Sequence, residues 1–181
     1  MKIAIDLEGT LIAECGEFPC ERTNTLAQLF LPNGVRKGAR QLLGELHRRG
    51  HSLTLYSSGA LPAWKLLLWC RTSGLSVHRI MTLPQAKKRT QKNTDKKQKR
   101  FAKELKALGL THMGKVLQIN CPPCHGHDLI LDDEQHHIHA AWRSGVRGVL
   151  VTNRDADWTA RIREATLTGQ GIETSTQTQA A

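Results

Sequence analysis

Short apolar runs alternate along the chain with longer stretches in which apolar residues recur every three or four positions. The short runs are typical of strands buried in a sheet, and the longer stretches have the period of amphipathic helices. We expect strands at residues 3–5, 52–56, 77–83, 116–119, 128–131 and 149–151. We expect helices at residues 35–46, 62–70, 101–108 and 134–143, and a last one that begins after Asp155 or Asp157 and ends near Ala165.

The order of these elements predicts the fold class. Strands that alternate with helices form a parallel sheet with helices on both faces, so we expect one α/β, Rossmann-like domain over residues 1–167. Residues 7–30 are expected to form a loop or hairpin flap, too short for a bulky cap domain. Residues 168–181 are rich in Thr, Gln, Ser and Ala and are expected to be a disordered tail.

Composition limits where the protein acts. No run approaches the roughly 20 apolar residues that span a bilayer, and Asp6 follows the first residue too soon for a signal peptide. These features predict a cytoplasmic protein with no membrane partner. The five cysteines are then expected to be reduced thiols or metal ligands rather than a disulfide framework.

The positive charge is concentrated in one basic segment, residues 87–106. This segment holds ten Lys and Arg residues against two acidic residues, so it carries +8 of the formal net charge of +10. Clustered Lys and Arg side chains bind polyanions because they release counterions from phosphate backbones. The sequence leaves two interpretations open: a nucleic-acid partner, or a solvated loop and helix face.

Polar residues suited to one reaction follow three of the expected strands. The first strand ends in Asp6-Leu7-Glu8-Gly9-Thr10, the second is followed by Ser57, and the strand at 128–131 is followed by Asp132 and Asp133. In a parallel sheet such ends meet at the carboxyl edge, where ligands bind. One carboxylate could attack a phosphoryl group there while another transfers the proton, and the remaining acids could hold a Mg²⁺ ion.

These motifs resemble those of the haloacid-dehalogenase-like (HAD) phosphatases, and they occur in the same order. The family's first motif is Asp-x-Asp-x-Thr, here Asp6-Leu7-Glu8-Gly9-Thr10. A Ser or Thr that ends an apolar strand matches Ser57, and an acid pair matches Asp132-Asp133. The resemblance covers residues 1 to about 165. It implies a HAD-like fold, a Mg²⁺ cofactor and an aspartyl-phosphate intermediate.

The resemblance also implies a role for each matching residue. Asp6 is expected to be the nucleophile and Glu8 the general acid/base. Metal ligands are expected from Asp6, the backbone carbonyl of Glu8, Asp132 and Asp133, and substrate contacts from Thr10, Ser57, Ser58 and Gly59. The departure from the pattern is Glu8, where the family usually has Asp, although the enolase-phosphatase branch resembles this sequence in having Glu. The longer side chain must deliver its proton from a shifted position.

The lysine of the family's third motif is not unique in this sequence. Lys115 is favoured, because the stretch from it to Asp133, with two adjacent prolines, resembles that of small family members. Lys97 fits an alternative alignment, and Lys87 or Lys88 a third.

Cysteines and histidines near the acid pair offer competing chemistry. Cys121, Cys124 and a nearby histidine could form a zinc site, and the alternative is a proline-stiffened turn with two thiols. Cys15 and Cys20 are not expected to complete that site, because they follow the first strand and should lie at the opposite edge of the sheet.

Helical histidines and tryptophans have simpler expected roles. His136, His137 and His139 lie just after Asp133, and His136 and His139 are spaced to share a helix face. We expect these histidines to be partly exposed unless one of them approaches the substrate pocket. The tryptophans that we expect to pack helices against the sheet are Trp64, Trp69, Trp142 and Trp158.

The sequence therefore predicts a Mg²⁺-dependent phosphomonoesterase that forms an aspartyl-phosphate at Asp6. A site without a large cap would admit a large substrate, and the basic segment favours a phosphorylated nucleic-acid end. Two alternatives stay open. One is a catalytically weak or inactive protein of the same fold that binds nucleic acid through residues 87–106, and the other is a zinc-stabilised interaction protein.

Overall fold

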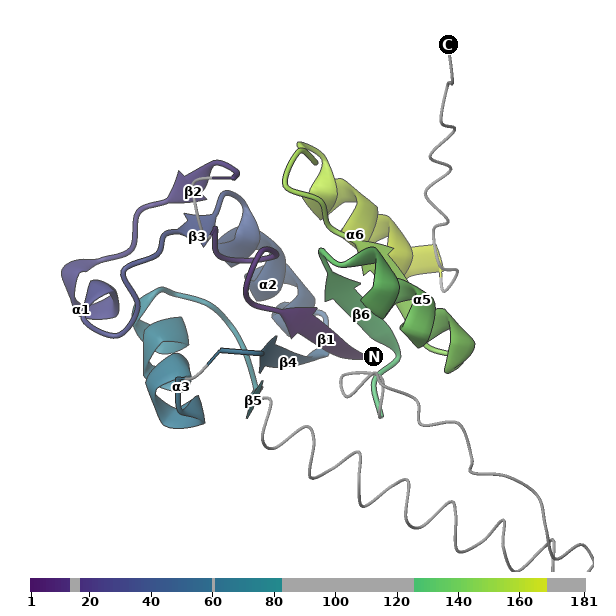
Figure 1. Ribbon diagram of the computed structural model, residues 1–181, viewed down its shortest axis with the longest axis horizontal. Coiled ribbons are helices and arrows are strands. Elements are labelled where there is room, and N and C mark those ends of the chain that lie inside the picture. Colours follow the sequence, from purple (N-terminus) through teal and green to yellow (C-terminus); the bar gives the residue numbers. More distant parts are fainter. Residues whose placement is uncertain (14–16, 60, 83–125, 169–181) are drawn as a thin grey trace, which may run out of the picture.

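The described residues form a five-stranded parallel sheet with the strand order β5-β4-β1-β6-β7 (Figure 1). The computed structural model describes residues 1–13, 17–59, 61–82 and 126–168. The strands are β1 (Lys2–Asp6), β4 (Ser52–Ser57), β5 (Arg79–Thr82), β6 (Leu129–Asp132) and β7 (Arg147–Leu150). This confirms the predicted α/β, Rossmann-like sheet. The strand predicted at residues 116–119 lies outside the described residues.

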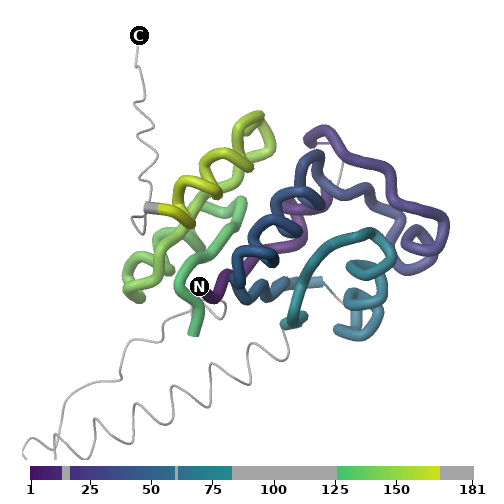
Figure 2. Tube along the Cα trace, turned by 180° about the vertical axis from the view of Figure 1, so that it is seen from behind, coloured from purple at the N-terminus to yellow at the C-terminus, as the bar shows by residue number. Residues whose placement is uncertain are grey.

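Helices cover both faces of the sheet. They are α2 (Ala39–Arg48), α3 (Ala63–Thr72), α5 (Gln135–Arg143) and α6 (Trp158–Thr168). Apolar residues of α2, α3 and α6 share one core cluster with Ile5 and Leu55, whereas α5 packs against Ala4 and Ile130, which point to the other face. Figure 2 shows α2 and α6 next to each other, where Nε of Arg163 donates to Glu45 at 2.8 Å.

The strand order explains which face each helix covers. The chain moves from β1 outward to β4 and β5, then returns to β6 on the other side of β1 and continues to β7. Crossovers between parallel strands are right-handed, so connections that run in opposite directions across a sheet lie on opposite faces. For this reason α2 and α3 share a face and α5 lies on the other.

A small ribbon lies between β1 and α2. In this ribbon β2 (Cys20–Glu21) pairs antiparallel with β3 (Val35–Arg36), and the four-residue helix α1 (Thr25–Gln28) lies between the two strands in the chain. The helix predicted from residue 35 therefore begins only at Ala39, because Val35 is occupied in the ribbon. Gly38, with a φ of 87°, makes the turn into α2.

The last helix is longer than predicted. Helix α6 extends to Thr168, beyond the predicted end near Ala165 and one residue into the predicted tail. The remainder of that tail and the basic segment lie outside the described residues. No helix in the described part of the chain has the length and apolar character needed to cross a membrane.

The four tryptophans divide into two pairs. Trp69 and Trp158 are buried, as predicted. Trp64 on α3 is 58% exposed, so the prediction that it packs against the sheet is wrong. Trp142 on α5 is 38% exposed, and its Nε1 lies 3.4 Å from the position of a Cβ added at Gly148 of β7, so it packs against the sheet in part. Their helices turn other residues toward the core, namely Leu66 of α3 and Ile138 of α5.

Candidate active site

The carboxyl ends of β1, β4 and β6 surround a pocket of about 320 Å³ that is lined mainly by acids. Five predicted site residues line it, namely Ser58 and the acids Asp6, Glu8, Asp132 and Asp133. They converge because β1 lies between β4 and β6 in register, with Asp6 beside Tyr56 and Ile5 beside Leu131. We call this hollow the acidic pocket.

Asp6 is the most deeply placed acid of the first motif, with 9% of its surface exposed. Burial, and after it the negative charges of Asp132, Glu8 and Asp133, raises the pKa of Asp6 to about 10. A buried carboxylate among like charges is stable as an anion only when a cation lies close to it. The arrangement therefore favours a cation in the acidic pocket.

Glu8 reaches across from the end of β1 to the end of β4. Its Oε1 accepts a hydrogen bond of 2.6 Å from the hydroxyl of Ser57, and its Oε2 accepts one of 3.1 Å from the backbone N–H of Ser58. The N–H of Gly59 donates to Oγ of Ser57 at 3.2 Å. Ser57 is buried and Ser58 lines the acidic pocket, and the substrate contacts predicted for both serines stay predictions.

Gly9 and Thr10 shape the turn that follows β1. Gly9 has a φ of +74°, and a Cβ added there would lie 2.2 Å from Oδ2 of Asp133, so only glycine fits this backbone against that carboxylate. The hydroxyl of Thr10, which is fully buried, donates to Oδ1 of Asp133 at 3.4 Å. The hydroxyl of Thr10 therefore has Asp133 as its hydrogen-bond partner in this structure. Its predicted contact with substrate stays a prediction.

His137 is the one of the three histidines after Asp133 that lines the acidic pocket. Its Nδ1 lies 3.1 and 3.0 Å from the two carboxylate oxygens of Asp132, which is 1% exposed. The hydrogen bond to Asp132 raises the pKa of His137. His136 is exposed and His139 bonds to Gln135, so neither lines the acidic pocket in this structure.

Tyr56, Glu17 and Glu134 complete the lining that the sequence did not predict. Burial, with the charge of Asp6 as the next cause, raises the pKa of Tyr56 to about 12. Tyr56 could have been found from its place directly before Ser57 at the end of β4. Glu17 belongs to the flap, whose position depends on pairing between distant segments.

Oxygen donors dominate the groups that could hold a metal. Six carboxylates line the acidic pocket, and carboxylate oxygens are the ligands that Mg²⁺ prefers. Within the described residues, one further set of donors is Glu134, His136 and His137, whose ligand atoms lie within 4.8 Å of one another. The candidate third-motif lysines and the predicted zinc ligands lie outside the described residues: Lys87, Lys88, Lys97, Lys115, Cys121 and Cys124.

Known proteins similar to this chain are found among solved structures. No protein-family model and no curated protein matches the sequence. The Pnkp1/Rnl/Hen1 RNA repair complex contains a chain with 16% identity and a TM-score of 0.45, over 83% of this chain and 42% of that one. The present chain thus spans less than half the length of that protein.

Two sugar phosphatases are similar over most of their length. D,D-heptose 1,7-bisphosphate phosphatase from B. bronchiseptica, crystallised with magnesium and phosphate, has 12% identity and a TM-score of 0.45, over 84% of this chain and 83% of that one. The enzyme of the same name from Burkholderia thailandensis has 11% identity and a TM-score of 0.43, over 96% and 91%. These similarities concern the fold, so the functional assignment depends on the geometry of the site.

Proposed function

We propose that the protein is a Mg²⁺-dependent phosphomonoesterase with Asp6 as its nucleophile. The observation that carries this proposal is the convergence of Asp6, Glu8, Asp132 and Asp133 on one pocket at the carboxyl edge of a parallel sheet. Phosphoryl transfer needs an attacking oxygen, a proton donor for the leaving group and a cation that neutralises charge. In the acidic pocket, Asp6 is the candidate for the attacking oxygen and Glu8 the candidate for the proton donor. The acids of the pocket are suited to bind the cation.

The donors in the acidic pocket fit Mg²⁺. Asp6, Asp132 and Asp133 supply hard oxygen ligands, and the backbone carbonyl of Glu8 is the fourth that we assign. Burial raises the pKa of Asp133 as well as that of Asp6, as expected for a cluster that a bound cation would neutralise. When bound, Mg²⁺ would offset the repulsion between these acids and a phosphoryl group.

Asp6 and Glu8 divide the chemistry in two steps. A carboxylate oxygen of Asp6 attacks phosphorus, the bond from phosphorus to the leaving oxygen breaks, and protonated Glu8 gives its proton to that oxygen. Glu8, now a carboxylate, takes a proton from water while the water oxygen attacks phosphorus and the bond to Asp6 breaks. Inorganic phosphate leaves, and both side chains return to their starting states.

Neighbouring residues position these groups. Ser57 orients Glu8, and Ser58 offers its backbone N–H and hydroxyl at the wall of the acidic pocket, where phosphoryl oxygens would lie. Thr10 and His137 hold Asp133 and Asp132. We assign the third-motif role to Lys115, which would neutralise charge on the phosphoryl group.

The test is turnover of an aryl monophosphate by the purified protein, with Mg²⁺ and with EDTA. Asp6→Asn should lower kcat by about a thousandfold or more, because it removes the nucleophile. The control is Asp128→Asn, which neutralises an acid before β6 that bonds to the backbone of Lys2, away from the acidic pocket. Full activity of Asp6→Asn, or no turnover of any phosphate monoester by the wild type, would falsify the proposal.

A further inference from the structure

A second hollow, of about 560 Å³, lies at the same edge of the sheet on the other side of the flap. Two consecutive flap residues separate the hollows, since Glu17 lines the acidic pocket and Phe18 lines the second one. The cations that line this second hollow are Arg36, Lys37 and Arg154, and we call it the basic groove. Arg154 comes to this edge because it follows the carboxyl end of β7.

Arg36 is a buried cation in the wall of the basic groove, with 2% of its surface exposed. Its guanidinium donates to the backbone carbonyls of Thr10, Thr152 and Asp155 and lies over the rings of Phe18 and Trp158, at 4.3 and 5.0 Å from their centres. No carboxylate among the described residues forms an ion pair with it. The groups in direct contact with its positive charge are therefore carbonyl dipoles and ring faces.

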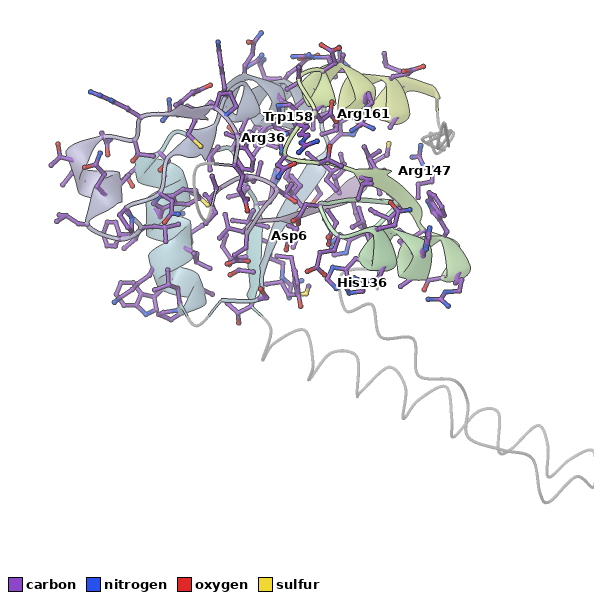
Figure 3. The ribbon with its side chains drawn as sticks, turned by 45° about the horizontal axis from the view of Figure 1, so that its top comes forward. Asp6, Arg36, His136, Arg147, Trp158 and Arg161 are labelled. Atoms are coloured by element: carbon purple, nitrogen blue, oxygen red, sulfur yellow. The ribbon has the colours of Figure 1, made fainter. Side chains whose placement is uncertain are left out.

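The acid of the basic groove is already neutralised. The carboxylate of Asp155 pairs with the guanidinium of Arg161, and Figure 3 shows Arg161 close to Arg36 and Trp158. Lys37 and Arg154 are exposed, and neither forms an ion pair with a described residue. The basic groove thus has a positive potential, opposite in sign to that of the acidic pocket.

A chain of hydrogen bonds through the turn after β1 connects the walls of the two hollows. Arg36 donates to the carbonyl oxygen of Thr10 at 3.4 Å, and the hydroxyl of Thr10 donates to Asp133 in the acidic pocket. In Figure 3, Asp6 lies between Arg36 on one side and His136 on the other. The two hollows are therefore neighbours at this edge of the sheet, with Glu17 of the flap facing one and Phe18 facing the other.

We propose that the basic groove binds a second phosphate group of the substrate while the acidic pocket acts on the first. The inference rests on the proposed phosphatase function and narrows it to substrates with at least two phosphates. Lys37 and Arg154 would pair with that second phosphate, and the buried charge of Arg36 would add to its attraction. Such a phosphate belongs either to a small bisphosphate or to the backbone of a phosphate-ended nucleic acid.

The kinetic test uses the double charge reversal Lys37→Glu/Arg154→Glu. Its matched control is Arg48→Glu/Arg143→Glu, which makes the same change in charge at exposed positions near the carboxyl ends of α2 and α5, at the opposite edge of the sheet. Substrates are an aryl monophosphate, a sugar bisphosphate and a 5′-phosphorylated oligonucleotide. The groove variant should raise KM by about tenfold or more for the substrates with further phosphates, and leave the aryl monophosphate within about twofold of wild type.

The same comparison identifies the source of the second phosphate, since the substrate whose KM rises most is the one that occupies the basic groove. Equal changes for all three substrates, or the same change in the control variant, would overturn the proposal.

A binding measurement separates this inference from the proposed function. Binding of the labelled oligonucleotide and of the bisphosphate is measured in EDTA, where no turnover is expected. Weaker binding of either ligand by the groove variant, about tenfold relative to wild type and to the control variant, would support the basic groove even if no catalysis were found. Unchanged binding of both ligands would overturn it even if the phosphatase activity were confirmed. The basic segment is the same in every variant, so a difference between the variants comes from the substituted positions.

Discussion

The hydroxyl of Ser57 donates a 2.6 Å hydrogen bond to Oε1 of Glu8, which precedes it by 49 residues in the chain. The backbone N–H of Ser58 holds the other carboxylate oxygen, so the ends of β1 and β4 are connected through one side chain. A glutamate has one methylene more than an aspartate, and its carboxylate is here drawn toward β4. The longer residue is therefore anchored rather than free, as a proton donor with a defined position must be.

Ser57→Ala should lower kcat about ten- to a hundredfold with little change in KM, because it removes the hydrogen bond that orients Glu8. Steady-state kinetics with an aryl phosphate measures both constants. Ser52→Ala, at the exposed amino end of the same strand, is the control and should behave as wild type. An unchanged kcat in Ser57→Ala would show that Glu8 does not depend on this bond.

Gly9→Ala should raise the Mg²⁺ concentration needed for half-maximal activity and lower stability, because its Cβ would lie 2.2 Å from Oδ2 of Asp133 and push that carboxylate away. Gly50→Ala is a matched control, since Gly50 also has a positive φ, of +77°, but has nothing within 4 Å of an added Cβ. In the control, the free energy of unfolding should fall only by the cost of the left-handed backbone conformation, about 1–2 kcal/mol. Mg²⁺ titration of activity and thermal unfolding measure the two effects, and equal losses in both variants would contradict the steric argument.

The metal-free protein should become less stable as the pH rises. The pKa of Asp6 is about 10 in the fold against an ordinary value of 3.8, so between these values the folded state binds more protons than the unfolded state. The stability contributed by the protonated form is complete below the lower value and is lost as the pH rises toward the upper one.

Thermal unfolding in EDTA from about pH 5 to about pH 9 tests this prediction. The Tm of wild type should fall relative to that of Asp6→Asn, and Mg²⁺ should reduce the difference. Parallel pH profiles for the two proteins would show that Asp6 is not responsible.

Two described cysteines should differ sharply in reactivity. Cys70 is fully buried on α3, and burial raises the pKa of its thiol to about 12, so little thiolate forms at neutral pH. Cys20 is exposed. Brief alkylation of the native protein followed by peptide mass spectrometry should modify Cys20 and spare Cys70 until denaturant is added, and rapid native labelling of Cys70 would contradict its burial.

Local patterns predicted the elements well but misplaced the start of α2. Val35, Ala39 and Leu42 do fall on one helical face, yet Val35 pairs with Glu21 in the ribbon. The competing interaction comes from a segment earlier in the chain, and a periodicity that is read along one segment cannot contain it.

Which histidine reaches the acidic pocket could not be chosen from the sequence for a related reason. The expected exposure of His136, His137 and His139 is confirmed, and the structure shows that His137 is the one that contacts Asp132. Which side of α5 meets the acidic pocket depends on where the helix starts, at Gln135, and on how Ile138 and Ala141 are buried against the sheet. These are properties of packing rather than of spacing.

By itself, the sequence determined the alternation of strands and helices and the placement of acids and serines at strand ends. Parallel strands carry their carboxyl ends to one edge, so Asp6, Ser57 and Asp132 had to meet there. Only the tertiary structure decided that Ser57 donates a hydrogen bond to Glu8, that His137 bonds to Asp132, and that a basic groove lies beside the acidic pocket. Those relationships join side chains from elements far apart in the chain, and their geometry follows from strand register, helix rotation and the path of the flap.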